Sequence, residues 1–193
     1  MTRRVEPMRE LDFITDRAIY ERVILEAVPS ARQFLWLATA DLKDLHVQRG
    51  RRMTPFLEVL AELAGRGVAI RLLHAKEPGP NFRRDFDRYP ALLDGMERIL
   101  CPRVHFKSVI VDGRWAYSGS ANLTGAGMGA KSPRRRNFES GFVTTDAALV
   151  EAVAAQFDAV WMGAACRDCG RKAHCSDYPA LLGRDEEAPP PAP

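Results

Sequence analysis

The stretch HFKSVIVDGRWAYSGSANLTGAG, residues 105–127, decides how this chain folds and where its polar side chains collect. It is typical of two apolar strands joined at Asp112-Gly113, because this dipeptide favours a tight two-residue turn with positive φ angles. His105 and Lys107 are two positions apart on the first strand and therefore share a face. A lone histidine in an apolar strand is usually a core residue, so its meaning depends on what faces it.

The expected register of this hairpin brings further polar groups to the same face. If Val111 pairs with Arg114, Ser120 lies directly opposite His105, and Asn122 follows in a short turn. A lysine with a hydroxyl, an amide and free backbone N–H groups suits an anion such as a phosphate. The imidazole beside them is available as a neutral nucleophile or a protonated acid at cellular pH.

This pattern resembles the HKD motif of the phospholipase D superfamily. The match is strongest over residues 104–127 and looser over 18–160, and it is closest to the small single-motif members, which include sequence-nonspecific bacterial endonucleases. The matching positions are a histidine, a lysine, an aspartate and a glycine-serine-x-asparagine turn, at His105, Lys107, Asp112, Gly119, Ser120 and Asn122.

The resemblance implies a mechanism and an assembly. His105 attacks the phosphorus to give a phosphohistidine, which water then hydrolyses, while Lys107, Ser120 and Asn122 hold the phosphate oxygens. No metal is needed for this covalent route. A second histidine must protonate the leaving alcohol, yet only the HxK at His105 is followed by the aspartate and the glycine-serine-x-asparagine turn of the motif. A homodimer that shares one site between two copies is the expected solution.

The segment NFESGFVT, residues 137–144, alternates as another strand and adds a carboxylate. Family resemblance makes Glu139 the group that binds the second ring nitrogen of His105 and stabilises the imidazolium. Asp112 also matches the motif, but it lies on the opposite strand face from His105. We therefore expect Asp112, like Gly119, to be structural.

The rest of the chain alternates between helical and extended patterns. We expect helices over 16–28, 55–65, 81–95 with a break near Pro90, and 146–162, and strands over 33–38, 68–73 and 137–144. The strand-helix-strand order predicts parallel pairing of the first two strands. Together with the resemblance, this predicts an α/β fold, a phospholipase D-like sandwich with a mixed central sheet flanked by helices, over residues 1–165.

Two basic clusters suggest a polyanionic partner. The net charge of +3 is modest, 28 basic against 25 acidic residues, so the argument depends on local clusters rather than overall charge. They flank the expected site strands and consist of Lys131, Arg134, Arg135 and Arg136 in one and Arg49, Arg51 and Arg52 in the other. DNA is the favoured partner, and a merely solvated loop is the alternative.

The segment 166–180 is rich in cysteine and suggests a structural metal. Cys166, Cys169 and Cys175 include a CxxC pair, which can hold one ion from a single turn. The fourth ligand is left open between His174 and Cys101. Zinc is the first choice, an iron–sulfur cluster the second, and unliganded thiols remain an alternative.

The two ends of the sequence differ in character from the middle. The N-terminal stretch is mixed and charged, and no apolar run approaches a membrane span, which favours a cytoplasmic protein that does not enter a membrane. Residues 181–193 are expected to form a disordered, proline-rich tail.

The function expected from the sequence is a phosphodiesterase, most plausibly a nuclease cutting DNA or RNA. A lipid phosphodiesterase would use the same residues but should present an apolar surface near the site. A non-catalytic nucleic-acid-binding module of a repair or defence assembly would keep the basic clusters without needing the histidine.

Overall fold

The computed structural model describes residues 10–43 and 45–178, and its centre is a seven-stranded mixed sheet in the order β1-β9-β8-β7-β2-β5-β6. The strands are β1 (Leu11–Thr15), β2 (Phe34–Thr39), β5 (Ala69–His74), β6 (Met96–Leu100), β7 (Lys107–Val111), β8 (Trp115–Gly119) and β9 (Ser140–Thr144). A separate two-stranded sheet is formed by β3 (His46–Arg49) and β4 (Arg52–Pro55). β2 pairs in parallel with β5 and antiparallel with β7, so the sheet changes direction beside the HxK strand.

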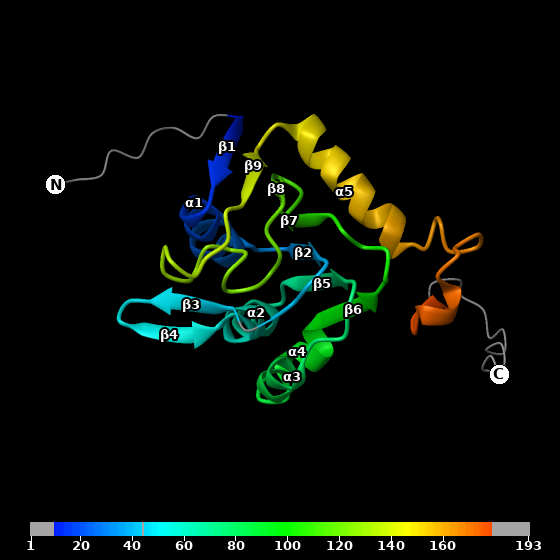
Figure 1. Cartoon of the computed structure of the whole chain (residues 1–193), viewed down its shortest axis with the longest axis horizontal. Coiled ribbons are helices and arrows are strands. Elements are labelled where there is room, and N and C mark those ends of the chain that lie inside the picture. Colours follow the sequence, from blue (N-terminus) through cyan, green and yellow to red (C-terminus); the bar gives the residue numbers. More distant parts are fainter. Residues whose placement is uncertain (1–9, 44, 179–193) are drawn as a thin grey trace.

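Helices cover both faces of this sheet (Figure 1). They are α1 (Arg17–Ile19), a π-helix η1 (Tyr20–Ala27), a 3₁₀ turn η2 (Val28–Ser30), α2 (Phe56–Gly65), α3 (Pro80–Phe86), α4 (Ala91–Gly95), α5 (Ala147–Trp161) and a 3₁₀ turn η3 (Lys172–His174). α5 packs on one face of β7 and β8, where Phe157 is fully buried beside Ile110. No helix within the described ranges is long and apolar enough to cross a membrane.

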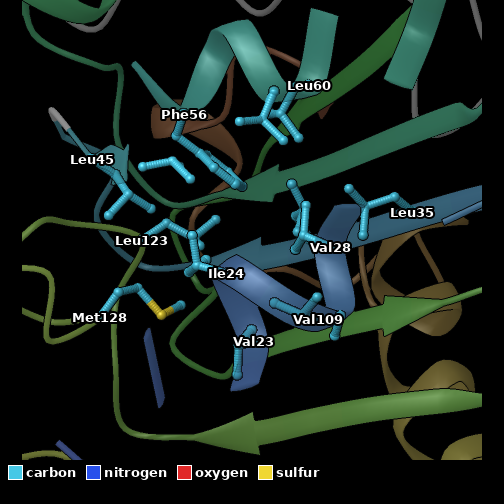
Figure 2. Packing of buried hydrophobic residues seen from close by; sticks show 14 of the residues in the cluster. Val23, Ile24, Val28, Leu35, Leu45, Phe56, Leu60, Val109, Leu123 and Met128 are labelled. Atoms are coloured by element: carbon cyan, nitrogen blue, oxygen red, sulfur yellow. The ribbon is translucent and has the colours of Figure 1, made fainter. Parts of the chain in front are cut away.

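The larger core lies on the other face of the sheet and includes part of the loop that follows the motif. Figure 2 shows side chains from the helical run 17–30, from α2 and from β2 and β7 packed together with two loop residues, Leu123 and Met128. Both loop side chains are 1% exposed. Their burial anchors the beginning of the loop that carries the basic residues.

The expected α/β sandwich is the observed fold, and most expected elements are present. The parallel pairing of β2 with β5 is confirmed, and Asp146 caps α5 by accepting a hydrogen bond from the Leu149 N–H at 2.9 Å. The expected break near Pro90 is confirmed, since α3 ends at Phe86 and α4 begins at Ala91. The expected helix from Pro55 begins one residue later, since Pro55 ends β4.

The register of the β7–β8 hairpin differs from the expected one by one residue. Val111 pairs with Trp115, and Lys107 with Gly119. The Arg114 N–H also bonds the Val111 carbonyl oxygen at 3.0 Å, so Arg114 and Trp115 both oppose one residue, as in a β-bulge. The predicted direct pairing of His105 with Ser120 is therefore wrong.

Candidate active site

Lys107 and His105 stand together where β7 begins. The Lys107 side chain is buried, 6% exposed, whereas His105 precedes the strand and is exposed. The Lys107 Nζ donates to the His105 carbonyl oxygen at 2.6 Å and lies 3.4 Å from its Nδ1. Burial lowers the pKa of Lys107, and the nearby Glu139 carboxylate opposes that shift. The result is a sheltered cation directly behind an accessible imidazole.

Glu139 bonds to different partners from those expected. Its carboxylate accepts hydrogen bonds from the Ser120 hydroxyl and, at 3.0 Å, from Asn137 Nδ2. Within the part of the chain that the structure describes, Glu139 makes no hydrogen bond to His105, so the expected ring contact is not formed in this arrangement. The β8–β9 register, which pairs Gly119 with Gly141, places Ser120 beside Ser140, whose N–H donates to the Ser120 hydroxyl oxygen at 3.1 Å. The β7–β8 ladder ends at Lys107, so His105 lies outside the strand.

The backbone of Glu139 is held by Asp16, a residue that sequence reasoning missed. The Asp16 carboxylate accepts from the Glu139 N–H at 3.0 Å, and the Asp16 N–H donates to the Glu139 carbonyl oxygen at 2.9 Å. Asp16 has φ 48° and ψ −115°, a backbone conformation that residues other than glycine rarely adopt. Its position just before a helical pattern indicated only a helix start.

Asn122 is oriented by the loop that follows β2. Its Oδ1 accepts from the N–H groups of Ala40 and Asp41, both at 3.1 Å, and lies 3.3 Å from the Thr39 hydroxyl oxygen. Backbone N–H groups only donate, so the atom that they contact must be the oxygen. The Asn122 Nδ2 group is thereby directed away from the loop with its N–H donors uncommitted among the described residues.

Thr39 is the second positioning residue that the sequence did not reveal. It is fully buried at the end of β2, where its hydroxyl donates to the Asp41 carbonyl oxygen at 2.7 Å and accepts from the Leu123 N–H at 3.0 Å. The threonine therefore joins the β2 end to the turn that carries Asn122. A polar residue closing an apolar strand was the available signal.

The buried Tyr117 side chain packs against Gly119 and explains why this motif position is a glycine. A Cβ atom on Gly119 would overlap the Tyr117 hydroxyl, and one on Gly141 would overlap its ring. The hydroxyl is buried without a hydrogen bond of ordinary geometry, although the Ala121 backbone is near. Burial raises the pKa of Tyr117 to about 12, with only a small opposing effect from Ala121. Gly119 is thus required by packing, which agrees with its expected structural role.

Asp112 serves the turn end of the hairpin. Its φ is 52°, and its carboxylate accepts from the N–H groups of Arg32, Gln33 and Phe34 at 2.8 to 3.2 Å. Burial by itself raises the pKa of this carboxyl, but the three backbone donors outweigh it and leave the pKa below its ordinary value. Asp112 therefore fastens the hairpin tip to the start of β2, as its structural assignment requires.

The two basic clusters differ in their pairing. The basic loop, residues 125–137, returns to the sheet at Asn137, two positions before Glu139. Its cationic side chains form no ion pair with any described residue; they are Lys131, Arg134, Arg135 and Arg136.

In the β3–β4 hairpin two of the three arginines are already paired. Arg49 makes a two-pronged contact with Glu62 at 2.5 and 2.6 Å, and Arg52 lies 3.6 Å from Glu58. Arg51 has no such partner among the described residues. Arg49 and Arg52 are therefore weaker candidates for phosphate binding than the sequence indicated.

The cysteine-rich segment lies at the end of β6. Cys101, Cys166 and Cys169 line a cavity of about 240 Å³, whereas His174 is exposed on η3. Burial raises the pKa of the Cys166 thiol, and the Arg171 N–H lowers that of Cys169. As their side chains stand, no three His, Cys, Asp or Glu residues in 10–43 and 45–178 are grouped closely enough to hold an ion. The proposed tail 181–193 lies outside the described residues.

The sequence matches the family model described as the PLD-like domain of cardiolipin synthase over residues 24–161. Among curated proteins no match is found.

Several solved structures share the fold at low sequence identity. Nuc, a phospholipase D family member from Salmonella typhimurium, is 18% identical with a TM-score of 0.57, covering 78% of this chain and 93% of that one. NucT from Helicobacter pylori is 16% identical with a TM-score of 0.55, covering 77% and 94%. TrmBL2, an archaeal chromatin protein with a novel mode of DNA binding, is 13% identical with a TM-score of 0.55, covering 82% and 54%. The family model spans most of the sequence and the fold agrees with it, so this chain belongs to the phospholipase D-like phosphodiesterase superfamily.

Proposed function

We propose that this chain is a nuclease that hydrolyses phosphodiester bonds in nucleic acid, with DNA as the first substrate. The observation that carries the proposal is the sheltered Lys107 ammonium behind the exposed His105 imidazole, next to a basic loop with unpaired cations. A cation in a low-dielectric environment attracts a phosphate more strongly than one in water. The cations of the basic loop would extend this attraction along the chain of phosphates in a nucleic acid.

The chemistry would proceed in two displacements. A ring nitrogen of His105 attacks the phosphorus, so that a P–N bond forms as the bond to the leaving oxygen breaks, and that oxygen takes a proton from a general acid. Water then attacks the phosphohistidine, which breaks the P–N bond and restores the imidazole. Lys107 and the Asn122 amide N–H groups offset the negative charge of the phosphoryl oxygens in both steps.

Glu139 and Ser120 have supporting roles in this proposal. The Ser120 hydroxyl is committed to Glu139, so it fixes the carboxylate first and contacts phosphate only if that bond is exchanged. The carboxylate in turn favours the charged form of Lys107 despite burial. Glu139 therefore helps to keep the phosphate-binding cation protonated.

The general acid is proposed to come from a second copy of the chain. Only the HxK at His105 continues as the complete motif. The other HxK, His74-Ala75-Lys76, has its histidine buried, with Nδ1 bonded to the Lys76 carbonyl oxygen at 2.8 Å. A twofold dimer would bring two His105 side chains to one phosphate, with one attacking and one donating the proton.

Subunit mixing tests this arrangement. Equal amounts of wild type and His105→Ala, allowed to exchange, should retain about a quarter of the activity if each site needs both histidines. Independent sites would leave about half, and full activity in a strict monomer would also contradict the shared site.

One observation favours a lipid substrate as the second candidate. Phe138, next to Glu139, is 94% exposed, and an apolar side chain at the rim could enter a lipid surface. The same ring could stack on a nucleobase. Phe138→Ala should therefore be assayed on both substrate classes.

The deciding experiment compares single-stranded DNA, double-stranded DNA, RNA and phosphatidylcholine vesicles, with His105→Ala as the matched control. We expect cleavage of nucleic acid that is lost in the variant and that persists in EDTA, because the nucleophile is a side chain. Hydrolysis of phosphatidylcholine without cleavage of any nucleic acid would contradict the proposal and favour a lipid phosphodiesterase. Binding of DNA without cleavage by the wild-type dimer would indicate the non-catalytic module.

The basic loop is tested separately by binding. Replacing Arg134, Arg135 and Arg136 with glutamate should weaken DNA binding by about tenfold or more and flatten its salt dependence. Arg49→Ala together with Arg52→Ala is the matched control and should change affinity less, because these side chains already face carboxylates. Equal effects from both sets would contradict the distinction between the two clusters.

A further inference from the structure

The segment after α5 has little means of its own to stay folded, yet its cysteines turn inward. Within residues 164–178 the only regular element is the single 3₁₀ turn η3, and the charged side chains of the segment are mostly exposed. The residues in this range that are not exposed are Cys166, Cys169, Cys175, Asp177 and Tyr178. A short segment without an apolar core needs some other link to the domain.

The inward side chains meet the end of β6, and in Figure 1 the orange segment lies beside this strand. Cys101, the first residue after β6, lines the same cavity as Cys166 and Cys169. The Cys175 Sγ lies 3.5 Å from the carbonyl oxygen of Leu100, the neighbour of Cys101. Asp177 accepts from the Leu100 N–H at 2.6 Å. Four thiols from two distant parts of the sequence therefore lie around the end of β6.

The local backbone is already shaped for thiolates. The Cys169 N–H bonds the Cys166 carbonyl oxygen at 3.1 Å, closing a tight turn, and the Arg171 N–H donates to the Cys169 Sγ at 3.4 Å. An N–H aimed at sulfur stabilises the thiolate form, which is the form that binds metal. His174, in contrast, is exposed, and among the described residues its side chain makes no hydrogen bond to any of the four cysteines.

We propose that Cys101, Cys166, Cys169 and Cys175 bind one zinc ion, with Cys101 and not His174 as the fourth ligand. The thiols are not grouped for an ion as they stand, so binding requires rotation about their Cα–Cβ bonds, a small change for partly exposed side chains. Four thiolates around Zn²⁺ satisfy its tetrahedral preference and leave two negative charges. Arg103, which lines the cavity, and the neighbouring Arg171 and Lys172 offset that charge.

This site would link the C-terminal segment to residues 101–104, which connect β6 to His105. The Cys101 carbonyl oxygen accepts from the Val104 N–H at 2.9 Å, which makes a turn immediately before His105. An ion held at Cys101 would therefore restrict the entry to β7 as well as the segment after α5. The site itself does not depend on the proposed nuclease activity, because its test is metal content.

The test is the metal content of the full chain, expressed with added zinc, purified anaerobically and measured by elemental analysis. We expect about one zinc per chain in wild type and in His174→Ala, and its loss in Cys101→Ser and Cys166→Ser. Loss in His174→Ala with retention in Cys101→Ser would overturn the assignment of the fourth ligand. Absence of metal from the wild type, or iron with visible absorption, would overturn the zinc site.

A second measurement guards against variants that fail to fold. Wild-type protein loaded with Co²⁺ in place of zinc should show the intense thiolate-to-metal absorption of a four-sulfur tetrahedral site. A spectrum with fewer thiolates, or one altered in His174→Ala, would contradict the proposal without requiring the cysteine variants to be stable.

Discussion

The two ends of the β7–β8 hairpin belong to one motif but do opposite things. At the open end, His105 is exposed and Lys107 is a buried cation whose pKa burial lowers. At the turn end, the Asp112 carboxylate is saturated by three backbone N–H groups of residues 32–34. The side chains at the open end are available to a ligand, whereas the carboxylate at the turn end is bonded to the backbone of the protein itself. The comparison teaches that residues of one motif can be separated into those that act on substrate and those that hold the strands.

The largest expected effect is at the open end. His105→Ala should lower the rate of phosphodiester cleavage by about 10³-fold or more, because it removes the nucleophile. An exposed histidine contributes little to packing, so the free energy of unfolding should change by less than about 0.5 kcal/mol. Single-turnover cleavage and thermal unfolding measure the two quantities. A variant that keeps a tenth of the activity would remove His105 from the mechanism.

Lys107→Met sharpens the comparison, since it removes a charge while preserving much of the side-chain volume. The rate should fall by about 10²-fold, as expected for loss of one charge-stabilising group. Stability should be unchanged or higher, because a buried ammonium is costly to desolvate. The fold is monitored by denaturant titration, and a loss of stability above about 2 kcal/mol would mean that the lysine is structural.

Asp112→Ala should give the reverse pattern. Three backbone N–H groups, two of them on the exposed residues Arg32 and Gln33, would lose their charged acceptor, which should destabilise the protein by about 2 kcal/mol. At a temperature where the variant is folded, its cleavage rate should stay within about threefold of wild type, since Asp112 is far from the open end along the hairpin. A selective loss of rate with unchanged stability would abolish the proposed division of roles.

The smallest expected effect is the pH dependence of the stability that Asp112 contributes at the turn end. The pKa of Asp112 is lower in the folded chain than its ordinary value, so its stabilisation is fully present above that ordinary value and is lost as pH falls through the folded pKa. Asp112→Asn should therefore be less stable than wild type near neutrality by about 1–2 kcal/mol, and the gap should close below about pH 4. Unfolding free energies across this range provide the measurement, and a constant gap would contradict it.

Local patterns in the sequence predicted that His105 and Lys107 lie together, whereas contacts between distant segments escaped prediction. The catalytic roles of these residues stay predictions. His105, Lys107 and Asn122 were recognisable because residue type and spacing suffice to mark them. The expected position of Ser120 was wrong because the hairpin has one residue more between its paired strands than the two-residue turn assumed, with Val111 opposite Trp115. Thr39 and Asp16 escaped because their partners lie more than 80 positions away in sequence. The fold class was accessible because strand and helix periodicities are local.

The position of β2 in the sheet has a consequence for synthesis of the chain. β2 is made early, but one of its two partners, β7, begins about 70 residues later, and residues 108–111 of β7 pair with residues 35–38 of β2. Until β7 emerges, the segment FLWLAT has an unpaired apolar edge on the ribosome, which is the state in which nascent chains need chaperones. Chains truncated before Lys107 should therefore aggregate when expressed, whereas the full chain stays in solution. Solubility of the truncated chain without chaperones would show that β5 alone protects this strand.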